Sequence, residues 1–170
     1  MAITYEYLQK WIEEYFTAFN TYGQSPDTVH RMDEYFAPDF EFRPYVATIT
    51  PVKGREEWYK VVTSHPSGYE KLTPEDILID ERRMLFAARI KAQILDSKTR
   101  ELLVEKRYFA NYPLELDKDG KLKVKRLEFF WEVLPAGAME IDDVFFRDWK
   151  ATSENPEIKA CDRDKSGVYI

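Results

Sequence analysis

The chain has 170 residues, of which 44% are hydrophobic and 33% charged, with a formal net charge of −6. This length fits one domain with a sizeable core. The acidic balance disfavours nucleic acid as a partner, and the apolar runs are too short to span a membrane. Because no signal peptide is visible and Cys161 is the only cysteine, we expect a cytoplasmic protein.

The N-terminal third is predicted to contain two helices. The first covers residues 4–21 and ends at Gly23, because apolar residues recur there at helical spacing. The second is predicted to begin at Ser25-Pro26-Asp27, which combines a capping hydroxyl with a proline at the first helical position. Pro38 disfavours helical geometry at Ala37 and should close the second helix.

A short strand and a third helix are predicted next. Residues 39–43 alternate, with Phe40 and Phe42 on one face, as in a half-buried strand. Pro44 and Pro51 bracket a stretch that should not be a central strand. The third helix is predicted over 55–64 with Trp58, Val61 and Val62 buried, and the sequence His65-Pro66-Ser67-Gly68 should end it.

Antiparallel strands are predicted near 75–80, 84–95, 102–116 and 122–134, with a hairpin turn at 117–121. The last three are long against a mean of roughly 5 or 6 residues, as a curled sheet requires. Residues 135–170 form a C-terminal extension rather than a second domain. Its apolar cluster of Phe145, Phe146 and Trp149 should dock residues 139–150 on the body of the domain or on a partner subunit.

Three segments carry a resemblance to a known family. They are Tyr35-Phe-Ala-Pro-Asp-Phe-Glu-Phe42, Gly54-Arg-Glu-Glu-Trp58 and Val124-Lys-Arg-Leu-Glu-Phe-Phe-Trp-Glu132. Together with the element order over residues 5–134, they resemble the SnoaL-like branch of the nuclear transport factor 2-like superfamily. The third segment looks like the closing strand of that family, with an apolar face of Leu127, Phe129, Trp131 and Val133.

The resemblance implies an α+β fold in residues 1–134. In that fold a curved antiparallel sheet wraps three N-terminal helices and leaves a conical pocket. It also implies cofactor-free acid/base chemistry without a bound metal, such as dehydration, isomerisation or cyclisation. Sheets of this family often pair through their convex faces, so a homodimer is predicted through the face that carries Arg126, Glu128, Phe130 and Glu132.

The catalytic residues of two related enzyme types are not matched here. Asn20 stands where dehydratase-type relatives carry an aspartate, and Phe129 stands where epoxide hydrolase-type relatives carry an acid. His65 is then the best candidate for acid/base work, because histidine titrates near neutrality. The alternative is that His65 simply ends the third helix. Tyr108 and Tyr112 could donate hydrogen bonds to a substrate, or their rings could pack while their hydroxyls reach water.

Aromatic residues on the inward faces of their elements should surround one cavity for a small apolar or polycyclic molecule. The predicted lining consists of Tyr15, Phe19, Tyr35, Phe42, Trp58, Tyr112, Phe129 and Trp131. Two alternatives to an enzyme remain open. One is a binding protein or accessory subunit that uses the same pocket without chemistry, and the other is a protein-interaction module that uses the outer sheet face.

Overall fold

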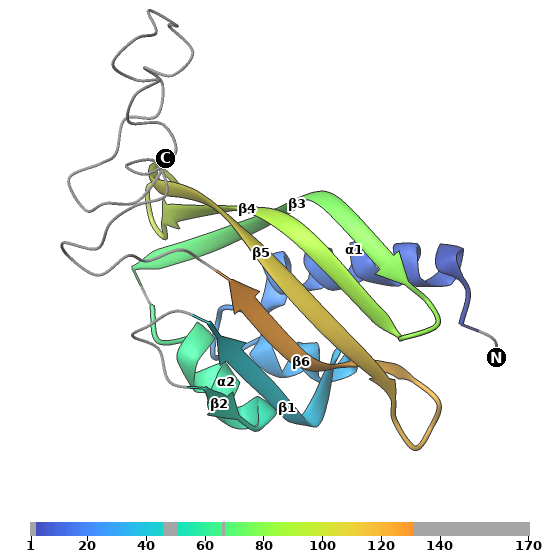
Figure 1. Cartoon of the computed structure of the whole chain (residues 1–170). Coiled ribbons are helices and arrows are strands. Elements are labelled where there is room, and N and C mark those ends of the chain that lie inside the picture. The colour runs from blue at the N-terminus through green and yellow to red at the C-terminus, as the bar shows by residue number, and fades with distance from the viewer. Residues whose placement is uncertain (1–2, 46–50, 66, 131–170) are drawn as a thin grey trace, which may run out of the picture. The chain divides into compact units, whose positions relative to one another are not determined.

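One mixed β-sheet packs against the helices in the computed structural model, which describes residues 3–45, 51–65 and 67–130 (Figure 1). The six strands follow the order β2-β1-β6-β5-β4-β3. The elements are α1 (Tyr5–Tyr22), the 3₁₀ helix η1 (Val29–Glu34), β1 (Phe36–Pro44), β2 (Val52–Lys53), α2 (Arg55–Val62), β3 (Gly68–Asp80), β4 (Leu85–Asp96), β5 (Leu102–Leu116) and β6 (Leu122–Phe130). The predicted α+β class is confirmed.

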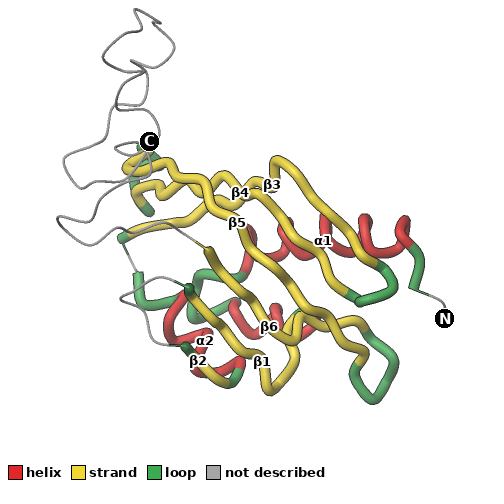
Figure 2. The backbone as a smooth tube through the Cα atoms, viewed as in Figure 1, coloured by secondary structure: helices red, strands yellow, loops and turns green. Residues whose placement is uncertain are grey.

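The first predicted helix is confirmed as α1 to within one residue at each end. Thr4 caps its N-terminus, where the Thr4 hydroxyl accepts a hydrogen bond from the Tyr7 amide at 3.3 Å. At the other end, the Gly23 amide donates to the Phe19 carbonyl at 2.9 Å. Its predicted apolar side is buried throughout. Figure 2 shows α1 behind the sheet and α2 next to β1 and β2.

The second predicted helix is wrong in type and in its end. The chain forms only η1, and β1 then begins at Phe36, two residues before Pro38. Pairing of β1 with β6 takes precedence over helical propensity here. Pro38, which has no amide hydrogen to donate, lies in the irregular stretch between Phe36 and Glu41 where the β1–β6 register shifts. The same β1–β6 pair is parallel, so the sheet is mixed rather than wholly antiparallel.

The third helix is confirmed as α2, but one of its buried positions differs from the prediction. Trp58 and Tyr59 are buried, Val62 is half-buried, and Val61 is exposed. Gly54 precedes α2 with φ of 91°, a left-handed conformation that favours glycine. The Gly54 amide donates to the Phe40 carbonyl at 2.8 Å and thereby ties the start of α2 to β1.

The long predicted strands are confirmed as β4, β5 and β6, and β3 begins seven residues earlier than predicted. All four are antiparallel neighbours. The part of the predicted last strand beyond Phe130, including Trp131 and Val133, lies outside the described residues, as does the extension over 135–170. No helix among the described residues is long and apolar enough to cross a bilayer.

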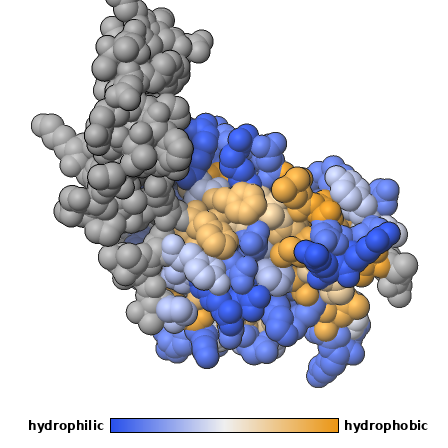
Figure 3. Space-filling view, in the orientation of Figure 1, coloured by the Kyte–Doolittle hydropathy of each residue, from blue (hydrophilic) through white to orange (hydrophobic). Residues whose placement is uncertain are grey.

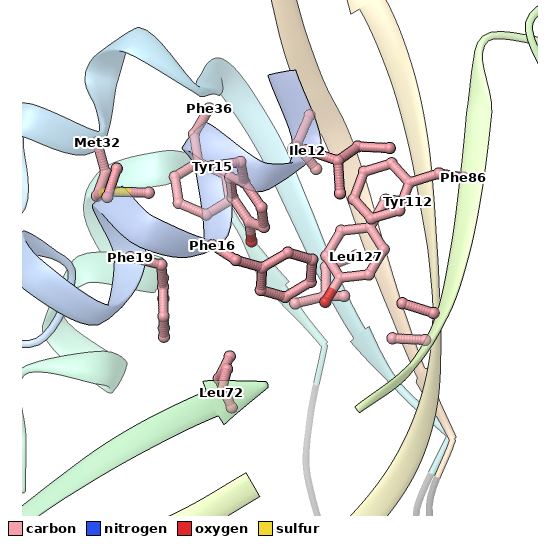
Figure 4. Packing of buried hydrophobic residues seen from close by; sticks show 14 of the residues in the cluster. Ile12, Tyr15, Phe16, Phe19, Met32, Phe36, Leu72, Phe86, Tyr112 and Leu127 are labelled. Carbon is pink, nitrogen blue, oxygen red and sulfur yellow. The ribbon is translucent and has the colours of Figure 1, made fainter. Parts of the chain in front are cut away.

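The core between α1 and the sheet is built from aromatic rings, with Tyr15 at its centre (Figure 4). The Tyr15 ring centroid lies 5.1 Å from that of Phe16 and 5.8 Å from those of Phe36 and Tyr112. Phe86 and Tyr112 stack with their planes 6° apart. Such edge-to-face and stacked pairs fix ring orientations beyond what burial alone does.

Candidate active site

A carboxylate side chain lies on the inward face of β3, at the edge of the sheet. Residues i and i+2 of a strand point to the same face. Leu72 is buried in the core, so Glu70 points to the same side. Glu70 is half-buried and pairs across the sheet with Ile94 of β4.

Two amide side chains at the end of α1 hold this part of β3 in place. The Asn20 side chain accepts from the Leu72 amide and donates to the Leu72 carbonyl, both at 2.8 Å. The Gln24 side chain accepts from the Glu70 amide at 2.6 Å and donates to the Glu70 carbonyl. Asn20 lies in the last turn of α1, and Gln24 lies in the turn that follows the helix. On the outer edge of β3 the two amides take the hydrogen-bonding place of a further strand.

Burial raises the pKa of Glu70 to about 7, because its charged form loses hydration. Burial also raises the pKa of Tyr15, Tyr108 and Tyr112 above the usual range of a phenol. For all three tyrosines the negative charge of Glu70 contributes further to the raised pKa. The phenols therefore stay protonated at neutral pH and can donate hydrogen bonds, while Glu70 can take up or release a proton.

A row of aromatic rings connects α2 with the neighbourhood of Glu70. The Trp58 and Phe42 ring centroids are 4.4 Å apart, those of Phe42 and Phe129 6.2 Å, and those of Phe129 and Tyr108 4.3 Å. Trp58 and Phe42 are buried, whereas Phe129 and Tyr108 are half-buried. This row is called the ring row below. It carries four of the residues that the sequence analysis assigned to the site.

The other predicted pocket residues lie deeper or elsewhere. Tyr15, Phe19 and Tyr112 are buried in the core, and Tyr35 is half-buried beside Tyr15, with ring centroids 5.8 Å apart. Trp131 lies outside the described residues. Tyr15 and Tyr112 are packed by neighbouring rings, whereas Glu70, Tyr108 and Phe129 are half-buried.

His65 lies apart from this interior. It is exposed just after α2, and its ring nitrogen Nε2 lies 3.5 Å from the hydroxyl of Ser64. Its catalytic role stays a prediction. The sequence analysis missed Glu70, because it placed the start of this strand at residue 75. The alternation of Glu70 and Leu72 directly after Gly68 was the signal that could have revealed it.

Solved structures of similar architecture place the fold in a known group. An NTF2-like protein from Anabaena variabilis matches 79% of this chain and 96% of its own, with a TM-score of 0.57 and 12% identity. A protein described as a SnoaL-like polyketide cyclase, from Jannaschia sp. CCS1, matches 72% and 83%, with a TM-score of 0.52 and 11% identity. The chain has the nuclear transport factor 2-like fold.

A third structure of this fold is SalBIII, an epoxide hydrolase/cyclase-like enzyme of pyran ring formation in the polyether salinomycin. It matches 74% of this chain and 90% of its own, with a TM-score of 0.50 and 16% identity. No protein-family model and no curated protein matches the sequence. At these identities the comparisons establish the nuclear transport factor 2-like fold and no activity.

Two surface hollows of about 460 and 470 Å³ lie outside the Glu70 region of this fold. The first lies between η1, α2 and the β5–β6 turn and includes Asp33, Arg55 and Lys123. Its charges are already paired, since Arg55 Nη2 lies 3.1 Å from Asp33 Oδ2 and Lys123 Nζ donates to two backbone carbonyls. The second follows α1 and includes Tyr35, one of the predicted pocket residues.

One group of side chains has the donor set of a metal site. The ligand atoms of His30, Asp33 and Glu56 lie within 4.8 Å of one another. However, Arg55 lies beside both acids, 3.1 Å from Asp33 Oδ2 and 3.6 Å from Glu56 Oε1. A guanidinium in this position offsets part of the negative charge of the two carboxylates and repels a metal cation. The arrangement therefore favours an ion-pair cluster over a metal centre.

Proposed function

We propose that this protein binds a small apolar or polycyclic molecule and catalyses cofactor-free acid/base chemistry on it, as a lyase or isomerase. Glu70 is the proton-transferring group in this proposal, and Tyr108 donates a hydrogen bond to the reacting oxygen. The observation that carries the proposal is the position of Glu70. Its carboxyl group lies on the inward face of β3, its charge raises the pKa of three phenols in the aromatic interior, and Gln24 holds both its backbone amide and its backbone carbonyl.

The environment of Glu70 suits proton transfer at neutral pH. A general base works best when its pKa lies near the working pH, and burial raises the pKa of Glu70 to about 7. In the proposed step, the Glu70 carboxylate removes a proton from the carbon next to a substrate carbonyl. The electron pair of the broken C–H bond forms a C=C bond, and the π pair of the carbonyl moves to its oxygen. The Tyr108 hydroxyl, which stays neutral, stabilises the resulting enolate.

The runner-up is a binding protein that uses the same interior without chemistry. The departures at Asn20 and Phe129 from the acids of related enzymes favour this alternative. Asn20 has a structural role in this fold, because its side-chain amide both donates to and accepts from the Leu72 backbone. The two candidates differ in one measurable respect, which is whether Glu70 exchanges protons with a bound carbon acid.

The test is deuterium exchange into β-tetralone, a bicyclic ketone with acidic C–H groups, followed by proton NMR in D₂O. We expect wild-type protein to accelerate exchange, with a rate that rises with pH and levels off above about pH 7, as the carboxylate forms. Glu70→Gln should lower the rate about 100-fold or more. The matched control is Glu75→Gln on the same strand, since Glu75 is exposed and paired with Arg107.

Two results would decide against catalysis by Glu70. Saturable β-tetralone binding without accelerated exchange would support the binding protein instead. Equal exchange rates in wild type and Glu70→Gln would remove Glu70 from the mechanism, provided both proteins give the same circular dichroism spectrum.

The predicted homodimer remains a proposal, now based on an exposed aromatic patch. On the sheet face that points away from α1, Tyr45 and Phe130 stack at 4.8 Å between centroids, and Phe109 is paired with Phe130 across β5 and β6. Figure 3 shows hydrophobic surface over β5 and the end of β6, with hydrophilic residues along part of its border. Arg126 and Glu128 flank it, and Glu132 lies outside the described residues.

Such a patch suits a two-fold interface, in which the same surface must complement itself. Sedimentation velocity should therefore give a dimer at micromolar concentration, and Phe130→Glu should shift it to monomer. Wild-type protein that sediments only as a monomer would contradict the proposal.

A further inference from the structure

Trp58 carries a buried hydrogen-bond donor that finds no acceptor among the described residues. The side chain lies on the inward side of α2 and is 7% exposed. Its ring packs on Phe42 at 4.4 Å and on Phe40 at 5.9 Å between centroids. Within the described part of the chain, nothing accepts a hydrogen bond from its buried Nε1–H group.

This donor differs from the two other buried side-chain nitrogens without a hydrogen-bond partner among the described residues, Arg55 Nε and Arg126 Nε. Each of those belongs to a guanidinium beside a carboxylate, 3.6 Å from Glu56 and 2.8 Å from Glu128 respectively. Their charges are therefore compensated. Buried donors in folded proteins are nearly always satisfied, and an unsatisfied one calls for an unseen acceptor.

The ring row connects the ring that carries this donor with the neighbourhood of the proposed acid/base group. It runs from Trp58 through Phe42 and Phe129 to Tyr108, and the charge of Glu70 acts on Tyr108. Flat aromatic faces bind flat apolar molecules through stacked or edge-to-face contacts. A planar ligand lying along the ring row would thus have Glu70 and Tyr108 at one end and the indole N–H at the other.

We propose that Trp58 Nε1–H binds a second oxygen of the ligand, at the end remote from the reacting carbonyl. This inference rests on the proposed function, because it concerns the same site, and it narrows the ligand class to planar, fused-ring ketones with a distal acceptor oxygen. Such a donor discriminates between ligands, because a ligand without the distal oxygen leaves the buried N–H unpaired.

The test compares two β-tetralones that differ only at the far end of the aromatic ring. One carries an acetyl group and the other an isopropyl group, which has nearly the same shape but no acceptor. In protein with ¹⁵N-labelled indoles, the acetyl compound should move the Trp58 N–H resonance downfield, and the isopropyl compound should not. Trp58→Phe identifies that resonance by its loss, and Trp11, buried on α1, serves as the reference signal.

Kinetics give an independent measurement on the same pair. Trp58→Phe should raise KM for the acetyl compound about fivefold to tenfold, the size expected for one hydrogen bond. The rise in KM for the isopropyl compound should be smaller, because that compound loses only ring contacts with Trp58 and no hydrogen bond. If Trp58→Phe does not fold, the wild-type resonance shifts alone decide.

The possible failures can be told apart. Equal resonance shifts with both compounds, equal KM changes, or no saturable shift at the solubility limit would overturn the Trp58 inference, even if Glu70-dependent exchange is present. A selective Trp58 shift without any exchange would uphold the donor and refute catalysis by Glu70.

Discussion

Two polar clusters connect helices to the sheet, and they differ in whether their charged groups are paired. Where η1, α2 and β6 meet, Asp33 accepts from the Tyr59 hydroxyl at 2.9 Å and pairs with Arg55 at 3.1 Å, while the Lys123 ammonium donates to the Asp33 and Glu34 carbonyls. Where α1 meets β3, neutral amides bind only the backbone of Glu70 and Leu72. The Glu70 carboxylate there has burial as the dominant influence on its pKa.

This difference supports a structural role for the first cluster and the proposed role of Glu70 in the second. A buried charge that is fully paired holds elements together, whereas an ionisable group whose pKa is shifted by burial is a candidate for function. The backbone of Glu70 is nevertheless fixed, because Gln24 binds both its amide and its carbonyl. A fixed backbone is one requirement of a positioned acid or base.

The largest expected effect follows from breaking the paired cluster. Lys123→Met should lower the free energy of unfolding by about 2–4 kcal/mol, because two carbonyls lose their buried donor and Asp117 loses a cation 3.8 Å away. Urea denaturation measures this. The control is Lys125→Met, two residues along β6, where the ammonium is exposed and an effect within about 0.5 kcal/mol is expected. Equal losses in both variants would contradict the distinction between the clusters.

The second prediction concerns the pH dependence of stability. Because the pKa of Glu70 rises from 4.5 in the unfolded chain to about 7 in the folded protein, folding favours the protonated form. The contribution of Glu70 to the free energy of unfolding is fully present below pH 4.5. Up to about 3 kcal/mol of it is lost as the pH rises through 7. Glu70→Gln should therefore be more stable than wild type above pH 7 and equal to it near pH 4. Thermal or urea unfolding between these values measures the difference. Parallel pH profiles of the two proteins would contradict it.

A third prediction concerns the hydrogen bonds between the Asn20 side chain and the backbone of β3. Asn20→Asp keeps the shape of the side chain but replaces the donor to the Leu72 carbonyl with a charge near Glu70. We expect a loss of about 2 kcal/mol at neutral pH, which shrinks in acid as the new carboxylate is protonated. The control is Gln9→Glu, an exposed amide-to-acid change on the same helix, which should stay within about 0.5 kcal/mol. Wild-type stability in Asn20→Asp would show that these hydrogen bonds do not position β3.

The smallest effect is expected at His65. Because its side chain is exposed, His65→Ala should change the free energy of unfolding by less than about 0.5 kcal/mol. It should also leave deuterium exchange into β-tetralone unchanged. A substantial loss of exchange in this variant, with wild-type stability, would instead support the catalytic role that the sequence predicted for His65.

Much of the fold could be predicted from local patterns in the sequence. Apolar spacing determined α1 to within one residue, and alternation identified β4, β5 and β6 with their connecting turn. The inward direction of Phe40, Phe42 and Leu127 also followed from alternation, and all three are buried. These features depend on the period of a helix or strand, which a short window of residues already contains.

Other features arise only when distant segments meet. The end of the second predicted helix was decided by the pairing of β1 with β6, because the Val124 amide donates to the Tyr35 carbonyl at 2.7 Å across 89 positions of sequence. The position of Glu70 depends on Gln24, 46 residues earlier, and the pKa of Glu70 depends on the apolar surroundings that the whole sheet provides. Local propensity describes the free energy of a segment on its own, whereas hydrogen-bond partners and desolvation are properties of the assembled fold. The tertiary structure therefore decided which acid became the candidate catalytic group.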